Sequence, residues 1–186
     1  MDKVITVEYS FRRFDDGLEM MEVEAEATTY DVETDERIVL GGAIGYVFKP
    51  YGSVRGWRDA VCAADAVSGD VVYTLTSLEE HHNGFTPGVF VLDSIEIHEQ
   101  YRNQNYGQRF MEVMMEDLFF LDVDLIGLTP GFYTPSATEE QKKWNPRLVA
   151  FYKRLGFELV ETDVDEGDVN DGKGDRSACI IHGAYG

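Results

Sequence analysis

The sequence predicts an α/β domain in which helices cover the faces of a sheet. In the second half of the chain, strand-like and helix-like patterns of apolar residues alternate, which is typical of this class. The 186 residues are 44% hydrophobic and 12% aromatic, so a core can form despite a formal net charge of −19. No internal repeat and no linker rich in Pro, Gly or Ser interrupts the sequence. We therefore expect residues 1–186 to fold as a single domain.

The beginning of the chain predicts three strands. Residues 3–9 and 20–28 alternate apolar and polar side chains, as half-buried strands do. Residues 38–48 are more continuously apolar, and their glycines mark a bulge or the close approach of another backbone. These glycines are Gly41, Gly42 and Gly45.

Two helices are expected next. Residues 56–67 place apolar side chains at helical spacing, and Ser68 and Gly69 end this helix. Residues 70–80 are compatible with either a helix or a strand. We favour a helix, which Asp70 would cap.

The second half of the chain predicts the centre of the sheet. Residues 88–98 begin with apolar side chains destined for both faces, as a buried central strand does. A polar turn then leads into a helix from about 106 to 119, which carries an apolar stripe. Residues 123–129 are expected to form another buried strand.

The end of the chain predicts a helix followed by two strands. We expect the helix to begin at Asn145 and Pro146, because Asn is a good N-cap and Pro suits the first helical position. Gly156 is expected to end it. Residues 157–162 and 177–185 have the patterns of strands, and the loop between them is rich in Asp and Glu.

The composition excludes several classes of protein. A sequence pI near 4.4 disfavours nucleic-acid binding and favours a cationic substrate or partner. No apolar run approaches the roughly 18 residues of a membrane span, and the first residues lack the apolar segment of a signal peptide. Cys62 and Cys179 form no metal-binding or disulfide pattern. We expect a cytoplasmic monomer or homodimer with no membrane, nucleic-acid or metal partner.

The strand–turn–helix at 88–119 is a candidate anion site. The first turn of a helix offers backbone N–H groups and the positive end of the helix dipole. Arg102 in the turn and Arg109 in the helix add positive charge where the protein as a whole has little. On these grounds a bound phosphate and a plain connecting turn are equally compatible with the sequence.

Two segments carry a resemblance to a known family. IEIHEQYRNQNYGQRF, followed later by NPRLVAFYKRLGFELVE, resembles the acetyl-CoA motif and the last helix of the GNAT superfamily of N-acetyltransferases. The resemblance implies a mixed, mostly antiparallel, twisted sheet of about six or seven strands flanked by helices. This chain departs from the family pattern by having Asn105 where the motif has its first glycine, although Asn tolerates left-handed backbone. It also places the helices expected at 56–80 after three strands.

The resemblance also implies where acetyl-CoA binds. The backbone of the turn at 102–108 would hold the pyrophosphate. The backbone of Ile95 and Ile97 would pair with the pantetheine arm, and Asn145 would hydrogen-bond its amide. The implied turn residues are Arg102, Asn103, Gln104, Asn105, Tyr106, Gly107 and Gln108.

The reaction that this family carries out needs a base and an acid. An alkyl amine, with a pKa of about 10.4, must lose a proton before it attacks a thioester, and a departing thiolate needs a proton donor. By resemblance Tyr152 is the acid, and it would also contact the cofactor. Asp93 is our preferred base and Glu96 the second choice. Their odd spacing predicts that they point to opposite faces of a strand, with Asp93 on the face of Val91 and Ile95.

The resemblance therefore implies an acetyl-CoA-dependent N-acetyltransferase that transfers directly to a primary amine. The acceptor would be a polyamine, an aminoglycoside-like amine, or a lysine or N-terminus of a basic protein. The acidic loop near the C-terminus is either a solvated loop or a border of the acceptor site that attracts cations. The rival function is a non-catalytic acidic protein that mimics a nucleic acid or inhibits a basic partner. An acyl-CoA other than acetyl-CoA is a third possibility.

Overall fold

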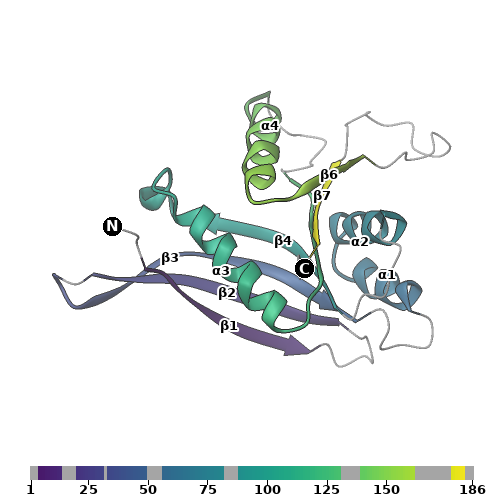
Figure 1. Ribbon diagram of the computed structural model, residues 1–186, viewed down its shortest axis with the longest axis horizontal. Helices are drawn as coiled ribbons and strands as arrows, with labels where there is room; N and C mark the ends of the chain where they lie inside the picture. The colour runs from purple at the N-terminus through teal and green to yellow at the C-terminus, as the bar shows by residue number, and fades with distance from the viewer. Residues whose placement is uncertain are drawn as a thin grey trace.

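The computed structural model describes residues 4–13, 20–31, 33–49, 56–81, 88–130, 139–161 and 177–182 (Figure 1). The strands are β1 (Thr6–Arg13), β2 (Met20–Asp31), β3 (Glu36–Phe48), β4 (Val89–Ile97), β5 (Leu125–Leu128), β6 (Glu158–Glu161) and β7 (Ser177–His182). The helices are α1 (Trp57–Asp65), α2 (Gly69–His81), the short η2 (Glu99–Tyr101), α3 (Tyr106–Phe120) and α4 (Glu139–Arg154). None of the helices in these ranges is long and apolar enough to cross a bilayer.

The described strands form a seven-stranded sheet in the order β1-β2-β3-β4-β5-β7-β6. Every pair is antiparallel except β4–β5, which is parallel because α3 crosses over the sheet between these two strands. The prediction of a mixed, mostly antiparallel sheet flanked by helices is therefore confirmed.

Two layers of helices bury the two faces of the sheet. Helix α3 crosses one face over β1 to β4, whereas α1 and α2 lie together on the other side (Figure 1). Along β4, Phe90 and Leu92 join a core cluster with α3, here named the α3-side cluster. Val89 and Val91 join a second cluster with α1 and α2, the α2-side cluster. The start of β4 is thus buried on both faces, as its apolar run predicts.

The bounds of α2 and α4 test two predictions made from the sequence. Residues 70–80 fall within α2, which confirms the helix over the strand. The prediction that a helix starts at Asn145 is wrong, because α4 already begins at Glu139 and has Pro146 in its interior. Pro146 has no N–H to donate to the preceding turn, so the sequence signal for a helix start marks a missing hydrogen bond inside the helix instead.

The glycines of β3 lie where neighbouring backbones approach closely, as predicted. A Cβ atom at Gly41 would overlap the carbonyl oxygen of Glu96, and one at Gly45 would overlap the ring of Phe90. A register shift in the pairing of β3 with β4 also falls next to Gly45. A side chain at either position would push β4 away from β3.

Helix α3 is held to the edge of the sheet by a hydrogen bond from Tyr9. The Tyr9 hydroxyl donates to Oδ2 of Asp117 over 2.8 Å, which links β1 to the last turns of α3. We expect Tyr9→Phe to lower the free energy of unfolding by about 1 kcal/mol, the usual net contribution of such a bond. Urea denaturation measures the change. In the matched variant Tyr101→Phe, whose hydroxyl has no hydrogen bond among the described residues, the loss should be smaller; equal losses would contradict the prediction.

Candidate active site

The sheet opens between β4 and β5. The two strands pair only from Val89–Leu125 to Leu92–Leu128, after which β5 ends and β4 continues to Ile97. On its other edge β4 stays paired with β3 over its whole length apart from one register shift. Among the described residues, the last part of β4 therefore has no partner strand on the side where β5 lies, and this opening is here named the gap.

The backbone of Ile95 and Ile97 faces this gap. The N–H of His98 donates to the carbonyl of Leu40 in β3 over 2.9 Å. The hydrogen-bonding direction alternates along an antiparallel strand. Ile97 and Ile95, which are one and three positions before His98, therefore turn their N–H and C=O groups away from β3. Consistent with this, the carbonyl of Ile97 accepts a hydrogen bond from Nε of Arg102 over 2.8 Å instead.

The turn between β4 and α3 has the backbone needed to begin a helix abruptly. Asn103 and Asn105 both have left-handed backbone, with φ of 60° and 65°. Asn105 is the N-cap residue of α3 and makes no side-chain capping hydrogen bond. The expectation that Asn105 accepts left-handed backbone in place of glycine is confirmed. Gly107 lies in the first turn, and a Cβ there would be 3.5 Å from Cγ1 of Ile97.

The side chains of this turn are engaged within the protein. The Gln104 amide donates to the carbonyl of Gln100, and the Gln108 amide donates to Oε1 of Glu112. Tyr106 is buried in the α3-side cluster. What the turn offers a ligand is therefore its backbone rather than these side chains.

Glu96 lies near the end of β4, beside the turn that leads to α3. One of its carboxylate oxygens is 3.1 Å from a guanidinium nitrogen of Arg102, in an ion pair with both side chains largely exposed. Exposed pairs of this kind contribute little stability. The pair orients Arg102 along the end of β4.

Asp93 is the extra residue of a β-bulge. Ile44 of β3 pairs with Ser94, and Gly45 pairs with Leu92, so Asp93 has no partner across the strand pair. A bulge inserts one residue and reverses the facing of those beyond it.

This bulge overturns the predicted facing of the two acids. Leu92 and Ile95 both pack in the α3-side cluster although they are three residues apart. Glu96 consequently lies on the same side of the sheet as Val91, and Asp93 lies beside Val91 but not on the face of Ile95. The expectation of opposite faces is wrong because strict alternation does not survive a bulge.

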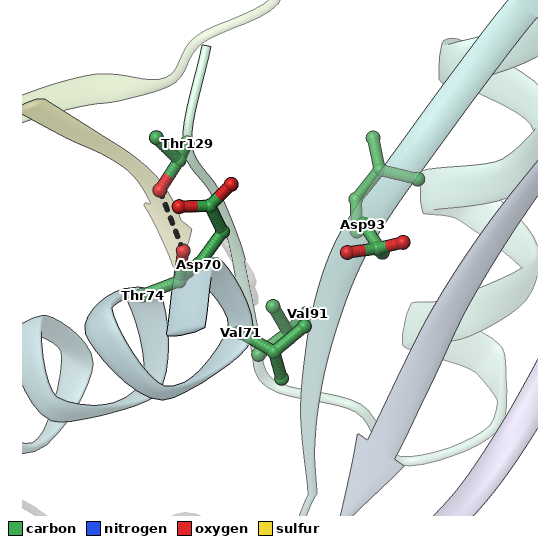
Figure 2. A pocket seen from close by; sticks show the side chains of 7 residues that line it. Asp70, Val71, Thr74, Val91, Asp93 and Thr129 are labelled. Carbon is green, nitrogen blue, oxygen red and sulfur yellow. Dashed lines mark hydrogen bonds between the residues drawn. The ribbon is translucent and has the colours of Figure 1, made fainter. Parts of the chain in front are cut away.

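Asp93 lines a small pocket between β4, α2 and the residue after β5. Figure 2 shows Asp70 and Thr74 on α2 and Asp93 on β4, with Val71 and Val91 between them. The hydroxyls of Thr74 and Thr129 are hydrogen-bonded at 2.8 Å. About 30 Å³ of the pocket is open to water, enough for an ordered water molecule. The lining residues are Asp70, Val71, Thr74, Val91, Leu92, Asp93 and Thr129.

The pocket disfavours a charged Asp93. Partial burial raises the pKa of this carboxyl above its ordinary value of 3.8, and the negative charge of Asp70 raises it further. Burial also raises the pKa of the neighbouring Tyr46, with smaller contributions from Asp93 and Glu22. A carboxylate with a raised pKa, open to solvent at a pocket, is suited to accept a proton.

Tyr152 approaches the sheet from the other face. It is 5% exposed and belongs to the α3-side cluster, where its ring packs edge-on against Phe151 and Phe157. The structure thus separates Tyr152 and Asp93 onto the two sides of the sheet. The side chain of Asn145 and the acidic loop at 162–176 lie outside the residues that the structure describes.

Sequence reasoning missed three residues of the pocket, which are Asp70, Thr74 and Thr129. The prediction that Asp70 caps this helix is wrong, because α2 begins at Gly69 and the Ser68 hydroxyl accepts the N–H of Val71 instead. Asp70 lies in the first turn of α2 and brings a second carboxylate to the pocket. Its position after Gly69 carries no signal for this role, because only the packing of α2 on β4 and β5 makes it a neighbour of Asp93.

Comparison with known proteins finds similarity in structure. No protein-family profile and no curated protein matches the sequence. Agmatine N-acetyltransferase in its apo form superposes with a TM-score of 0.50 at 16% identity, over 86% of this chain and 73% of that chain. A Drosophila melanogaster polyamine N-acetyltransferase gives 0.49 at 16% identity over 86% and 74%. A mosquito arylalkylamine N-acetyltransferase-like protein gives 0.49 at 14% identity over 86% and 74%.

Proposed function

We propose that this chain, which has the fold of the GNAT acetyltransferases, is an N-acetyltransferase that uses acetyl-CoA and a cationic amine. One observation carries the proposal: beyond Leu92 no described strand pairs with the edge of β4 that faces β5, the start of α3 lies at one end of this edge, and the Asp93 pocket lies beside it. A fold alone does not determine an activity, so we infer the activity from the residues of this site.

The residues at the gap fit acetyl-CoA. The N–H and C=O groups of Ile95 and the N–H of Ile97 can pair with the amides of an extended arm as a further strand would, while the carbonyl of Ile97 is already bonded to Arg102. The backbone N–H groups at the start of α3, with the positive end of the helix dipole, suit a pyrophosphate. Acetyl-CoA, when bound, supplies the acetyl group as a thioester.

The pocket provides for the proton that the amine must lose. An alkyl ammonium with a pKa of about 10.4 has to be deprotonated before its nitrogen can form the new C–N bond. We assign this proton to Asp93, directly or through a water molecule in the pocket. Tyr152 is assigned the opposite task, to donate a proton to the departing sulfur as the C–S bond breaks.

The charge of the site favours a cationic acceptor. Asp70 and Asp93 line the same pocket, and the protein carries 35 acidic against 16 basic residues. Such a field concentrates cations near the site. Agmatine and linear polyamines, the substrates named for the similar structures, are therefore the first acceptors to test.

The test begins with binding and continues with turnover. Calorimetric titration with acetyl-CoA at moderate salt should show micromolar affinity, and release of free CoA should require an added amine. The amines tested as acceptors are agmatine, spermidine, an aminoglycoside and a lysine-rich peptide. No binding up to millimolar acetyl-CoA would overturn the proposal and leave the acidic interaction protein as the better interpretation.

Arg102 provides a matched test of the cofactor site. Arg102→Glu places a negative charge beside the expected pyrophosphate and should weaken acetyl-CoA binding by about tenfold or more, since hydrogen bonds to charged groups contribute about 1.5–3 kcal/mol. The control is Arg58→Glu on α1, an exposed residue away from this turn, which changes the charge by the same amount. Titration of both variants decides the matter, and equal losses would show a general effect of charge rather than a site at Arg102.

A further inference from the structure

Strand β1 is an open edge of the sheet. It is the terminal strand, and among the described residues it is hydrogen-bonded only to β2. Its eight residues pair with β2 without any register shift, and they include no proline. Natural edge strands are usually protected by bulges, prolines, charged side chains or a covering segment, because an open edge is a template for another strand. Of these, β1 has the charged side chains of Glu8, Arg12 and Arg13.

The outward hydrogen-bonding groups of β1 follow from the sheet register. The hydrogen bond from His98 to Leu40 shows which residues of β3 turn their backbone N–H and C=O groups towards β4. Because this direction alternates along each strand, the registers of β3 with β2 and of β2 with β1 show which residues of β1 bond to β2. The even-numbered residues of β1 then bond to β2, which agrees with the carbonyl of Thr6 accepting a bond from the Thr28 hydroxyl. The odd-numbered residues turn their N–H and C=O groups outward. These are Val7, Tyr9, Phe11 and Arg13.

The sequence of β1 is complementary to itself when reversed about Ser10. In an antiparallel pair of two copies centred there, Glu8 of each copy is opposite Arg12 of the other. Tyr9 is opposite Phe11 in the same way, so opposite charges meet on one face and aromatic rings meet on the other. Centring the pair on Tyr9 or Phe11 instead gives neither set of pairs.

The exposed side chains near this edge favour a second copy of the chain over another partner. Phe11 is 50% exposed and stacks on Tyr9, with ring centroids 6.2 Å apart. Phe120 is 85% exposed at the end of α3, the helix that Tyr9 holds to the edge. Strand β1 also carries one acid and two arginines, so two copies repel less here than a chain of net charge −19 would elsewhere.

We propose that the protein forms a symmetric dimer in which β1 pairs antiparallel with β1 of a second copy, centred on Ser10. The two sheets then form one continuous sheet with both α3 helices on the same side. The ion pairs within each chain, Arg12 with Glu22 and Arg37 with Glu8, join the new Glu8–Arg12 contacts in a network across the junction. The dimer does not depend on the proposed enzymatic activity.

The first experiment measures association. Sedimentation velocity of the full chain over a range of concentrations should show a dimer, and Phe11→Lys should raise the dissociation constant at least tenfold. The control is Ile44→Lys, because Ile44 is also partly exposed on the sheet, at 38%, but lies on β3. A monomer at all concentrations, or equal weakening by both variants, would overturn the proposal.

The second experiment tests the register. With the exposed Cys62 replaced by serine, Ser10→Cys should form a disulfide-linked dimer under mild oxidation, because directly opposed residues without mutual hydrogen bonds have Cα atoms about 4.5 Å apart. Thr6→Cys lies on the same face of β1 and is the matched control. In this register its two copies are about 27 Å apart, at eight residues of roughly 3.4 Å each, so it should not cross-link. Efficient cross-linking at residue 6, or none at residue 10, would rule out this pairing.

Discussion

Asp93→Asn is expected to lower the rate of acetyl transfer at neutral pH by about 10²-fold or more while raising the free energy of unfolding. The loss of rate follows from removing the group that accepts the amine proton, since general base catalysis contributes about 10²–10⁴-fold. The gain in stability follows from the raised pKa of the Asp93 carboxyl, which means that the folded protein disfavours its charge. Opposite signs for rate and stability are typical of a functional residue.

The pH dependence of both effects has a definite sign. An acid whose pKa is higher in the folded state stabilises the fold below its unfolded pKa, and this contribution is lost as the pH rises through the folded pKa. The stability gained in Asp93→Asn should therefore be present at neutral pH and vanish below about 3.8. The wild-type rate should fall as the pH drops through the raised pKa of Asp93, because a protonated carboxyl cannot act as a base.

The measurements are steady-state rates and urea unfolding of the same variants. Glu79→Gln, which removes an exposed charge from α2, is the control and should change neither quantity appreciably. Glu96→Gln tests the second candidate base. If Glu96→Gln rather than Asp93→Asn abolished turnover with acetyl-CoA affinity unchanged, the assignment of the base would be wrong.

Asp70→Asn should shift the pH profile to lower pH. Asp70 raises the pKa of Asp93 by charge repulsion, so its neutralisation lowers that pKa and extends activity towards acid. The midpoint of the acidic limb of kcat/KM reports the shift. An unmoved midpoint would show that Asp70 does not act on the group that titrates.

Gly41→Ala is expected to destabilise the fold by about 3 kcal/mol, at the upper end of the cost of overpacking. The new Cβ would overlap the carbonyl oxygen of Glu96 and come within 2.9 Å of Cα of Ile97. These are backbone atoms of β4, so no side chain can turn aside, and the strand itself must move.

The displaced strand is the one that borders the gap, so Gly41→Ala should also weaken acetyl-CoA binding in the protein that remains folded. Gly69→Ala is the control, because a Cβ there meets nothing within 4 Å and alanine favours the helix that Gly69 begins. Thermal unfolding should show a loss for Gly41→Ala and no loss for Gly69→Ala. Equal changes would contradict the assignment of close packing at Gly41.

Much of the fold can be predicted from the sequence because its signals are local. The alternation in β1 and β2, the apolar run of β4 and the stripe of α3 each depend on residues within one element. Asn105 could be assigned left-handed backbone for the same reason, since the side chain itself permits that conformation.

The predictions that fail are those that depend on another segment. The facing of Asp93 and Glu96 depends on a bulge, and a bulge exists only relative to the partner strand β3. The glycines of β3 signalled an irregularity but not which strand would carry the extra residue. Asp70 reaches the pocket through the packing of α2, and the start of α4 lies six residues before the cap signal at Asn145.

The position of α1 and α2 in the chain, between β3 and β4, affects which part of the sequence selects the acceptor. Phe48 and Val89 are directly paired at the ends of β3 and β4, so a short turn would suffice to join these strands into a hairpin. The chain instead inserts 49–88 at this point, and the insert supplies one wall of the pocket. In the proposed enzyme, this single exchangeable module contributes to the selection of the acceptor, while the donor is bound by residues that follow it. Grafting a different helical pair between Phe48 and Val89 should therefore alter acceptor preference and leave acetyl-CoA affinity intact.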